Sequence, residues 1–214
     1  MTAFSYSVFA KGGPVMWLLG LLGLIALVVF IERALFLHQG QIRSTAFLDG
    51  IKNLLQKDRL MEALTVCEET PGPVAKLVKA GLRHATDDEQ GMRYAIQEAA
   101  LAEIPVLERR ISALAAIAQI APLFGLLGTL LGMIRTFWQF NQGGNYATSA
   151  ALAGGMWEAL LTAAAGLAVA IPAQVARHFL TSRVRALVQD MEWVASELMR
   201  FLLRDYRAGK DQAR

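Results

Sequence analysis

Three long runs without a charged side chain constrain this chain more than any other feature. They extend over residues 12–31, 111–134 and 159–176. At about 1.5 Å per residue, each run comes close to the ~20 residues needed to cross ~30 Å of hydrocarbon. The whole chain is 55% hydrophobic and 18% charged, whereas a soluble domain has about 25% charged residues. The sequence therefore predicts three membrane-spanning helices.

The first run has one competing interpretation, a signal peptide that is cleaved off. Lys11 is the only basic residue before it, and the run is longer than the roughly 7–15 residues of a signal-peptide core. It continues into "FIERALFLHQ", which contains no cleavage site of small residues. We therefore expect a retained first helix.

The basic residues predict the orientation of the three spans. Of 21 Lys and Arg residues, eleven lie between Arg33 and Arg110 and eight between Arg177 and Arg214. Lys and Arg concentrate on the cytoplasmic side of a membrane. This places the N-terminus outside and the C-terminus in the cytoplasm. It also accounts for the pI near 9.2 without a nucleic-acid surface.

Cysteine and histidine usage argues against a metal site or a disulfide. Cys67 is the only cysteine, so no intramolecular disulfide forms, and it falls in a section expected in the reducing cytoplasm. The three histidines, His38, His84 and His178, have no ligand spacing. We expect neither a metal nor another cofactor.

The rest of the sequence predicts an all-α integral membrane protein whose helices extend far into the cytoplasm. We expect a periplasmic N-terminus at 1–12, membrane helices at 13–34, 111–138 and 150–176, a cytoplasmic helical domain at 35–110, a periplasmic loop at 139–149, a cytoplasmic amphipathic helix at 177–207 and a disordered tail at 208–214.

Local signals predict where helices begin, break and bend. The "TPGP" at 70–73 is a break, and Thr86 stands three residues before a glutamate, which is a capping-box pattern for the next helix. Beyond it, Pro105 and Pro122 are the only strong interruptions. We expect one long helix here, kinked at these prolines, that rises into the second span. Pro172 is expected to bend the third span and free a carbonyl.

A stripe of apolar residues continues the third span beyond the membrane. It recurs every three or four positions at Leu180, Val184, Leu187, Met191, Val194, Leu198 and Leu202. Two interpretations remain open for it. The stripe packs on the protein's own cytoplasmic helices, or it packs between subunits.

The second span carries a stripe with almost no side chains. Gly125, Gly128 and Gly132 lie at i, i+3 and i+7, with Thr129 beside them. Small residues allow helix backbones to approach closely in a membrane, so helix packing is one interpretation and a pore face the other. A phosphate-binding loop is excluded, because no strand precedes "GLLGTLLG" and no lysine follows it.

The third span retains a carboxylate. Glu158 and Thr162 are four residues apart and share a helix face, with Gly155 and Gly166 near it. An ionised side chain inside a bilayer costs at least about 2.5 kcal/mol, so it indicates a functional path by default. The alternative is a structural ion pair with Arg135 on the neighbouring span, and the two roles are compatible.

These motifs together resemble the TolQ/ExbB/MotA family of energy-transducing channel proteins. The resemblance rests on "APLFGLLGTLLGMIRTF", "EALLTAAAGLAVAIPAQ", "EIPVLERRISALAAIAQIAPL" and "FIERALFL", and it covers most of the chain from residue 15 to about 180. Three spans rather than four resemble the TolQ/ExbB branch.

The resemblance implies a homopentamer that surrounds two copies of an ExbD/TolR-like single-span protein. That partner would supply the membrane aspartate that takes up the ion, and a TonB/TolA-like protein would join. Thr129 stands at the family's second-span threonine and Glu158 at its third-span glutamate. The implied function is an ion-conducting stator that uses the proton-motive force to drive TonB-dependent uptake, Tol-Pal function or motility.

One position departs from the family pattern. Members commonly carry a threonine five residues after the glutamate, often preceded by another. Here that position is Ala163, and Thr162 is the only threonine of the two positions. Either Thr162 substitutes for it, or the hydration of this site differs. The sequence therefore leaves H⁺ and Na⁺ both open as the coupling ion.

Two other functional classes were weighed. A non-conducting membrane scaffold, whose cytoplasmic helices recruit other proteins, would need Glu158 only to pair with Arg135. A membrane enzyme has no support, because the sequence contains no recognisable nucleophile–base pair, metal spacing or nucleotide loop.

Overall fold

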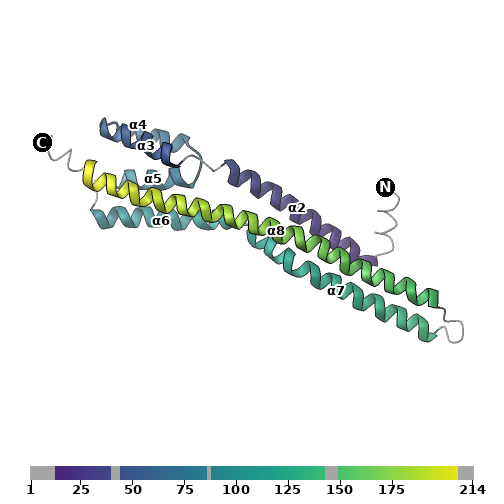
Figure 1. Ribbon diagram of the computed structural model, residues 1–214. Coiled ribbons are helices and arrows are strands. Elements are labelled where there is room, and N and C mark those ends of the chain that lie inside the picture. Colours follow the sequence, from purple (N-terminus) through teal and green to yellow (C-terminus); the bar gives the residue numbers. More distant parts are fainter. Residues whose placement is uncertain (1–12, 40–43, 86–87, 143–148, 207–214) are drawn as a thin grey trace. The chain divides into compact units, whose positions relative to one another are not determined.

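A computed structural model describes residues 13–39, 44–85, 88–142 and 149–206, and all regular secondary structure in these ranges is helical (Figure 1). The expected N-terminal segment 1–12, the centre of the expected loop 139–149 and the expected tail 208–214 lie outside the described residues. The elements are α2 Gly13–Gln39, α3 Ser44–Gln56, α4 Leu60–Glu69, α5 Pro73–Arg83, α6 Glu89–Glu108, α7 Ile111–Gln142, α8 Ser149–Phe201 and the π-helical turn η2 Leu202–Tyr206.

The helices divide into two compact units. The membrane unit comprises Met1–Glu32 and Arg110–Phe179, and the helical unit comprises Arg33–Arg109 and Leu180–Arg214. Helices α2 and α8 contribute to both.

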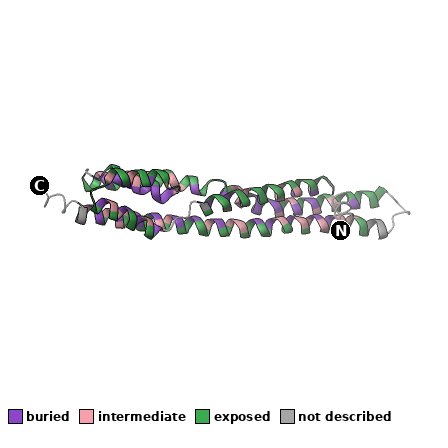
Figure 2. Ribbon diagram, turned by 90° about the horizontal axis from the view of Figure 1, so that it is seen from above, coloured by how far each residue is buried: buried purple, intermediate pink, exposed green. Residues whose placement is uncertain are grey.

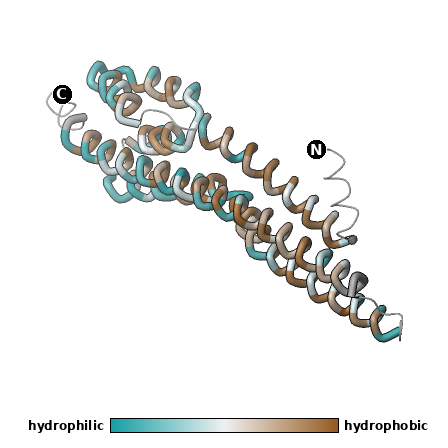
Figure 3. The backbone as a smooth tube through the Cα atoms, turned by 45° about the vertical axis from the view of Figure 1, so that its right-hand side comes forward, coloured by the Kyte–Doolittle hydropathy of each residue, from teal (hydrophilic) through white to brown (hydrophobic). Residues whose placement is uncertain are grey.

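The described residues contain three helices long and apolar enough to cross a membrane, which confirms the predicted three spans. Figure 3 shows that hydrophobic colouring prevails along α2, along α7 and in the N-terminal part of α8, whereas α3–α6 carry much more hydrophilic colour. Many large apolar side chains of these three helices are exposed in the single chain, among them Trp17, Leu123, Ile134 and Phe137. Such a surface suits lipid or other membrane helices as its surroundings.

The expected single helix from residue 89 into the second span is wrong. Helix α6 ends at Glu108, Arg109 has extended backbone angles, and Arg110 adopts a left-handed conformation with φ 66° before α7 begins. Neither Pro105 nor Pro122 is the break, since both lie inside helices. A left-handed non-glycine residue costs on the order of 1 kcal/mol, and the guanidinium of Arg110 forms an ion pair with Glu32 of α2.

Helix ends in the helical unit follow the sequence signals in one place and depart from them in another. The predicted break at 70–73 is confirmed, because α4 ends at Glu69 and α5 begins at Pro73. Thr86, on which the predicted capping box rests, lies outside the described residues, and α6 begins at Glu89. The residue that caps α6 is Asp88, whose side chain accepts a hydrogen bond from the backbone N–H of Gly91 at 2.9 Å. Both residues are good caps, so local sequence alone did not decide between them.

The apolar stripe of α8 forms the centre of the helical unit. All seven of its residues, Leu180 to Leu202, are at most 5% exposed. At Gly81 of α5, an added Cβ would come within 2.8 Å of Leu198 and 3.2 Å of Ile96, so α5 lies against both α8 and α6. The stripe therefore packs on the protein's own helices, as one of the two open interpretations had it.

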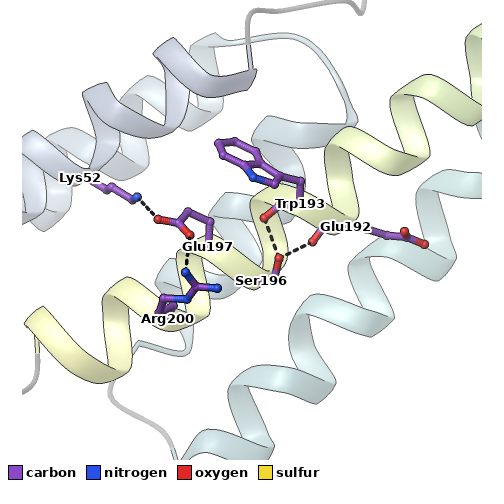
Figure 4. Close-up of polar contacts among 6 residues, drawn as sticks. All are labelled: Lys52, Glu192, Trp193, Ser196, Glu197 and Arg200. Carbon is purple, nitrogen blue, oxygen red and sulfur yellow. Dashed lines mark hydrogen bonds and ion pairs between the residues drawn. The ribbon is translucent and has the colours of Figure 1, made fainter.

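Polar contacts connect α3 to the same part of α8. Lys52 Nζ lies 2.7 Å from Glu197 Oε1, and Arg200 approaches the other oxygen of that carboxylate (Figure 4). Hydrogen bonding and attraction from Lys52 lower the pKa of the Glu197 carboxyl. Ser44 Oγ donates to Asp190 Oδ2 at 3.2 Å. The two contacts involve the first residue of α3 and a residue in its C-terminal half, and together they hold α3 against α8.

Cys67 provides a test of burial in the helical unit. Its side chain is 3% exposed, and burial raises the pKa of the thiol to about 11, an effect that nearby Lys79 partly offsets. Only the thiolate is a good nucleophile. We therefore expect alkylation of Cys67 by iodoacetamide at pH 8 to be about a hundredfold slower in the native protein than in the unfolded chain. Because the pKa of Cys67 is raised in the folded state, its contribution to the free energy of unfolding is fully present below pH 9 and is lost as the pH rises towards 11. Equal alkylation rates in both states would contradict this burial.

Candidate functional site

The carboxylate that the sequence singled out lies beside the arginine that the sequence offered as its partner. Glu158 of α8 has a side chain 30% exposed, and Arg135 of α7 is 61% exposed. Arg135 Nη1 is 3.7 Å from Glu158 Oε1, which is within ion-pair range but too long for a good hydrogen bond. Within the described part of the membrane unit, Glu158 and Glu32 are the only acidic residues. Glu32 pairs with Arg110, so Glu158 is the only carboxylate at this site.

Thr162 is a packing residue in the single chain. It is 2% exposed, and its hydroxyl donates to the carbonyl of Ala159 at 2.8 Å, with the carbonyl of Glu158 at 3.4 Å. Its side chain fills the space left by the missing Cβ of Gly128, where an added Cβ would lie 2.8 Å from both Thr162 Cβ and Oγ1. Its role in an ion path stays a prediction.

Thr129 lies apart from this pair. It is half-buried on α7, and its hydroxyl donates to the carbonyl of Leu126 at 2.6 Å. It is not among the residues that line the small cavity around Glu158. The structure of one chain therefore brings Glu158, Thr162 and Arg135 together and leaves Thr129 outside this group.

The glycines of both spans face one another along what we call the glycine seam. A Cβ added at Gly125 would lie 3.1 Å from the carbonyl oxygen of Thr162, and one added at Gly132 would lie 3.1 Å from Ala159. A Cβ added at Gly166 would lie 2.8 Å from the carbonyl oxygen of Ala121. At Gly155 it would overlap the hydroxyl of Thr136. The seam thus comprises Gly125, Gly128 and Gly132 of α7 and Gly155 and Gly166 of α8. Its small residues hold the two backbones close together, and α7 and α8 lie side by side in both ribbon views (Figure 1 and Figure 2).

The position that departs from the family pattern also lies at this seam. Ala163 is half-buried, and its Cα would be 3.3 Å from a Cβ on Gly125. Positions 162 and 163 therefore both pack against α7, each opposite a different glycine.

The first turn of α2 completes the surroundings of Glu158, which sequence reasoning missed. A partly open cavity of about 40 Å³ is lined by residues of three helices: Pro14, Val15, Gly128, Leu131, Gly132, Arg135, Glu158 and Thr162. No pattern in the first span points to Glu158, because contacts between helices far apart in sequence leave no periodic signal. Among the described residues, no three His, Cys, Asp or Glu side chains cluster so as to hold a metal ion.

Comparison with known proteins places this site in a family. The model of the MotA/TolQ/ExbB proton channel family matches residues 69–193, which include the whole glycine seam and Glu158. The chain belongs to this family. It is therefore a multi-pass membrane protein of a channel family rather than an enzyme, and the resemblance drawn from the motifs is confirmed.

Similar proteins carry ExbB and TolQ names. An ExbB homologue of Methanothermobacter thermautotrophicus is 25% identical over 187 residues, which cover 87% of this chain and 66% of that protein. An ExbB-like biopolymer transport protein of Synechocystis sp. is 33% identical over 193 residues, 89% of this chain and 76% of that protein. The TolQ protein of the Tol-Pal system of Haemophilus influenzae is 42% identical over 88 residues, 41% of this chain and 38% of that protein. The chain thus spans about two thirds to three quarters of the two ExbB-like relatives.

The glycine seam yields a stability prediction. Gly128→Ala places a methyl group against Thr162, and overpacking of this kind costs about 1–3 kcal/mol. We expect a clear drop in the thermal unfolding temperature of the detergent-purified protein. The double change Gly128→Ala with Thr162→Gly, which moves the side chain to the other helix, should recover part of the loss. Gly154→Ala is the matched control, because an added Cβ there meets nothing within 4 Å. Equal effects at positions 128 and 154 would contradict the seam.

Proposed function

We propose that this chain is the ion-conducting stator subunit of an energy-transducing complex of the inner membrane, similar to ExbB and TolQ. In this proposal it uses the proton-motive force together with an ExbD/TolR-like single-span partner. The driven process belongs to the cell envelope, such as TonB-dependent uptake, Tol-Pal function or motility. A TonB/TolA-like protein would transmit the work.

The observation that carries the proposal is the carboxylate of Glu158 inside the membrane unit. It lies 3.7 Å from Arg135, beside a small cavity, in a region matched by a proton channel family. Carboxylates at such positions mark ion and proton pathways. Thr129 and Thr162 are proposed to provide hydroxyl groups to the same pathway, and the glycine seam to hold the two helices in place.

The need for a partner follows from the inventory of acidic groups. Of the two acidic residues in the described part of the membrane unit, Glu158 is half-buried, and Glu32 is exposed and already paired with Arg110. A motor that loads and releases an ion at the midplane needs a second carboxylate there, and an ExbD/TolR-like aspartate would supply it. The exposed apolar side chains of α2 and α7 are consistent with a homopentamer around such a partner. The distribution of Lys and Arg supports a periplasmic N-terminus and a cytoplasmic C-terminus.

A second candidate is favoured by the Arg135–Glu158 contact itself. If the two side chains only neutralise one another, the chain is a membrane scaffold whose helical unit recruits other proteins. The scaffold requires opposite charges at the two positions but no carboxylate at position 158 in particular.

Replacement of the carboxylate distinguishes the two candidates. In vesicles that contain the chain and an ExbD/TolR-like partner, Glu158→Gln should lower proton flux by about tenfold or more, because the amide cannot bind and release a proton. The flux is measured with a pH-sensitive dye under an imposed potential. Leu160→Gln, an exposed position on the same helix, controls for the added amide.

A charge swap between positions 135 and 158 tests whether the position of the carboxylate matters or only the presence of the ion pair. Arg135→Glu combined with Glu158→Arg retains the pair but moves the carboxylate to α7. The stator proposal expects the flux to stay low in the swapped protein. Full recovery in the swap, or undiminished flux in Glu158→Gln, would contradict the role proposed for Glu158. Absence of proton flux from the wild-type protein with its partner would support the scaffold.

The oligomeric state is a separate prediction. The detergent-extracted chain should have the native mass of five subunits, and co-expression with an ExbD/TolR-like partner from the same genome should add about two partner chains. Native mass spectrometry measures both values, and an unrelated single-span protein is the control. A monomer or dimer that ignores the partner would contradict the proposed assembly.

A further inference from the structure

The cavity beside Glu158 has the composition of a water site. Its volume is about 40 Å³, and its polar lining comes from Arg135, Glu158 and Thr162. The rest of the wall consists of two α7 glycines and the apolar side chains Leu131, Val15 and Pro14. A cavity holds a water molecule when it is polar, offers two to four hydrogen-bonding groups and has at least about 10–15 Å³ of accessible volume.

The geometry of the ion pair points to the same conclusion independently. The two charged groups are 3.7 Å apart at their closest atoms, and a polar contact longer than about 3.5 Å often has water between its groups. A carboxylate accepts up to about four hydrogen bonds and a guanidinium donates five. The 3.7 Å contact satisfies few of these, so both groups keep hydrogen-bonding capacity, and both line the cavity.

We infer that Glu158, Arg135 and Thr162 hold one or more water molecules in this cavity, and that the first turn of α2 forms part of its wall. The inference deepens the proposed function and rests on it for its mechanistic meaning. Each water accepts a hydrogen bond from the Arg135 guanidinium and donates one to the Glu158 carboxylate. A proton that arrives on such a water passes to a carboxylate oxygen and leaves neutral water behind, and the reverse transfer resets the site.

The inference gives α2 a part in the ion pathway. Val15 and Pro14 form the wall of the cavity opposite the polar groups of α7 and α8. Val15 also packs against the cluster of Leu19, Ala121 and Ala170, which fixes its position. The first span therefore contributes to the wall around the hydrated carboxylate as well as anchoring the chain in the membrane.

Two neighbouring leucines of α7 provide a matched test. Leu131 lines the cavity and is 48% exposed, whereas Leu130 is 51% exposed and lies outside the cavity lining. Leu131→Phe should push the ring into the cavity, displace water and lower proton flux in partner-containing vesicles by about tenfold, whereas Leu130→Phe should stay within about twofold of wild type. Val15→Phe fills the same space from the opposite wall and should act like Leu131→Phe. Equal flux in all variants and wild type would overturn the inference.

A structural measurement separates this inference from the proposed function. Cryo-electron microscopy of the full chain with its partner, at a resolution that shows ordered water, should reveal density within hydrogen-bonding distance of Glu158 and Arg135. That density should be lost in Leu131→Phe and retained in Leu130→Phe. A direct, dry bond between the two side chains would overturn the water site even if the wild-type protein conducts. Water density in a protein that carries no flux would support the site and refute the stator.

Discussion

The close approach of α7 and α8 is the constraint on which the site depends. Five glycines and the small residues opposite them let the two backbones come together, so that Thr162 fills the space at Gly128 and Ala159 lies against Gly132. This packing sets the register of the two helices. The register in turn brings Arg135 level with Glu158. A charged pair inside the membrane unit thus follows from contacts that are almost entirely apolar and backbone in character.

In the proposed stator, Glu158 has two physical demands to meet at once. Neutralisation by Arg135 lowers the cost of a carboxylate within an apolar unit, but a tight, direct bond would also prevent the group from exchanging a proton. The observed separation of 3.7 Å and the small cavity next to it are a compromise between these demands. Such a compromise suits a proton channel family better than a pair whose only task is structural, where the shortest contact would be preferred.

The sequence predicted the fold well where the signals were local and strong. The three apolar runs, the break at 70–73 and the buried stripe of α8 all reflect composition or periodicity, and the structure contains each of them. The break between α6 and α7 could not be predicted, because Arg109 and Arg110 are ordinary helix formers and the left-handed angle of Arg110 accompanies a long-range ion pair with Glu32. For the site, spacing put Glu158 and Thr162 on one helix face. It did not reveal that Thr162 is buried against Gly128 or that Val15 of a distant span lines the cavity.

The contact between Gly128 and Thr162 also limits how this sequence can diverge. Because one position supplies the side chain and the other the space, the two should change together among relatives rather than independently. A relative whose threonine stands at the position of Ala163 instead of Thr162 gains room opposite position 128, but it must then fit the extra atoms beside Gly125. The choice of threonine at position 162 or 163 thus depends on the residues of α7 that pack against it. Correlated substitution at 125, 128, 162 and 163 is the evolutionary signature that this packing should leave.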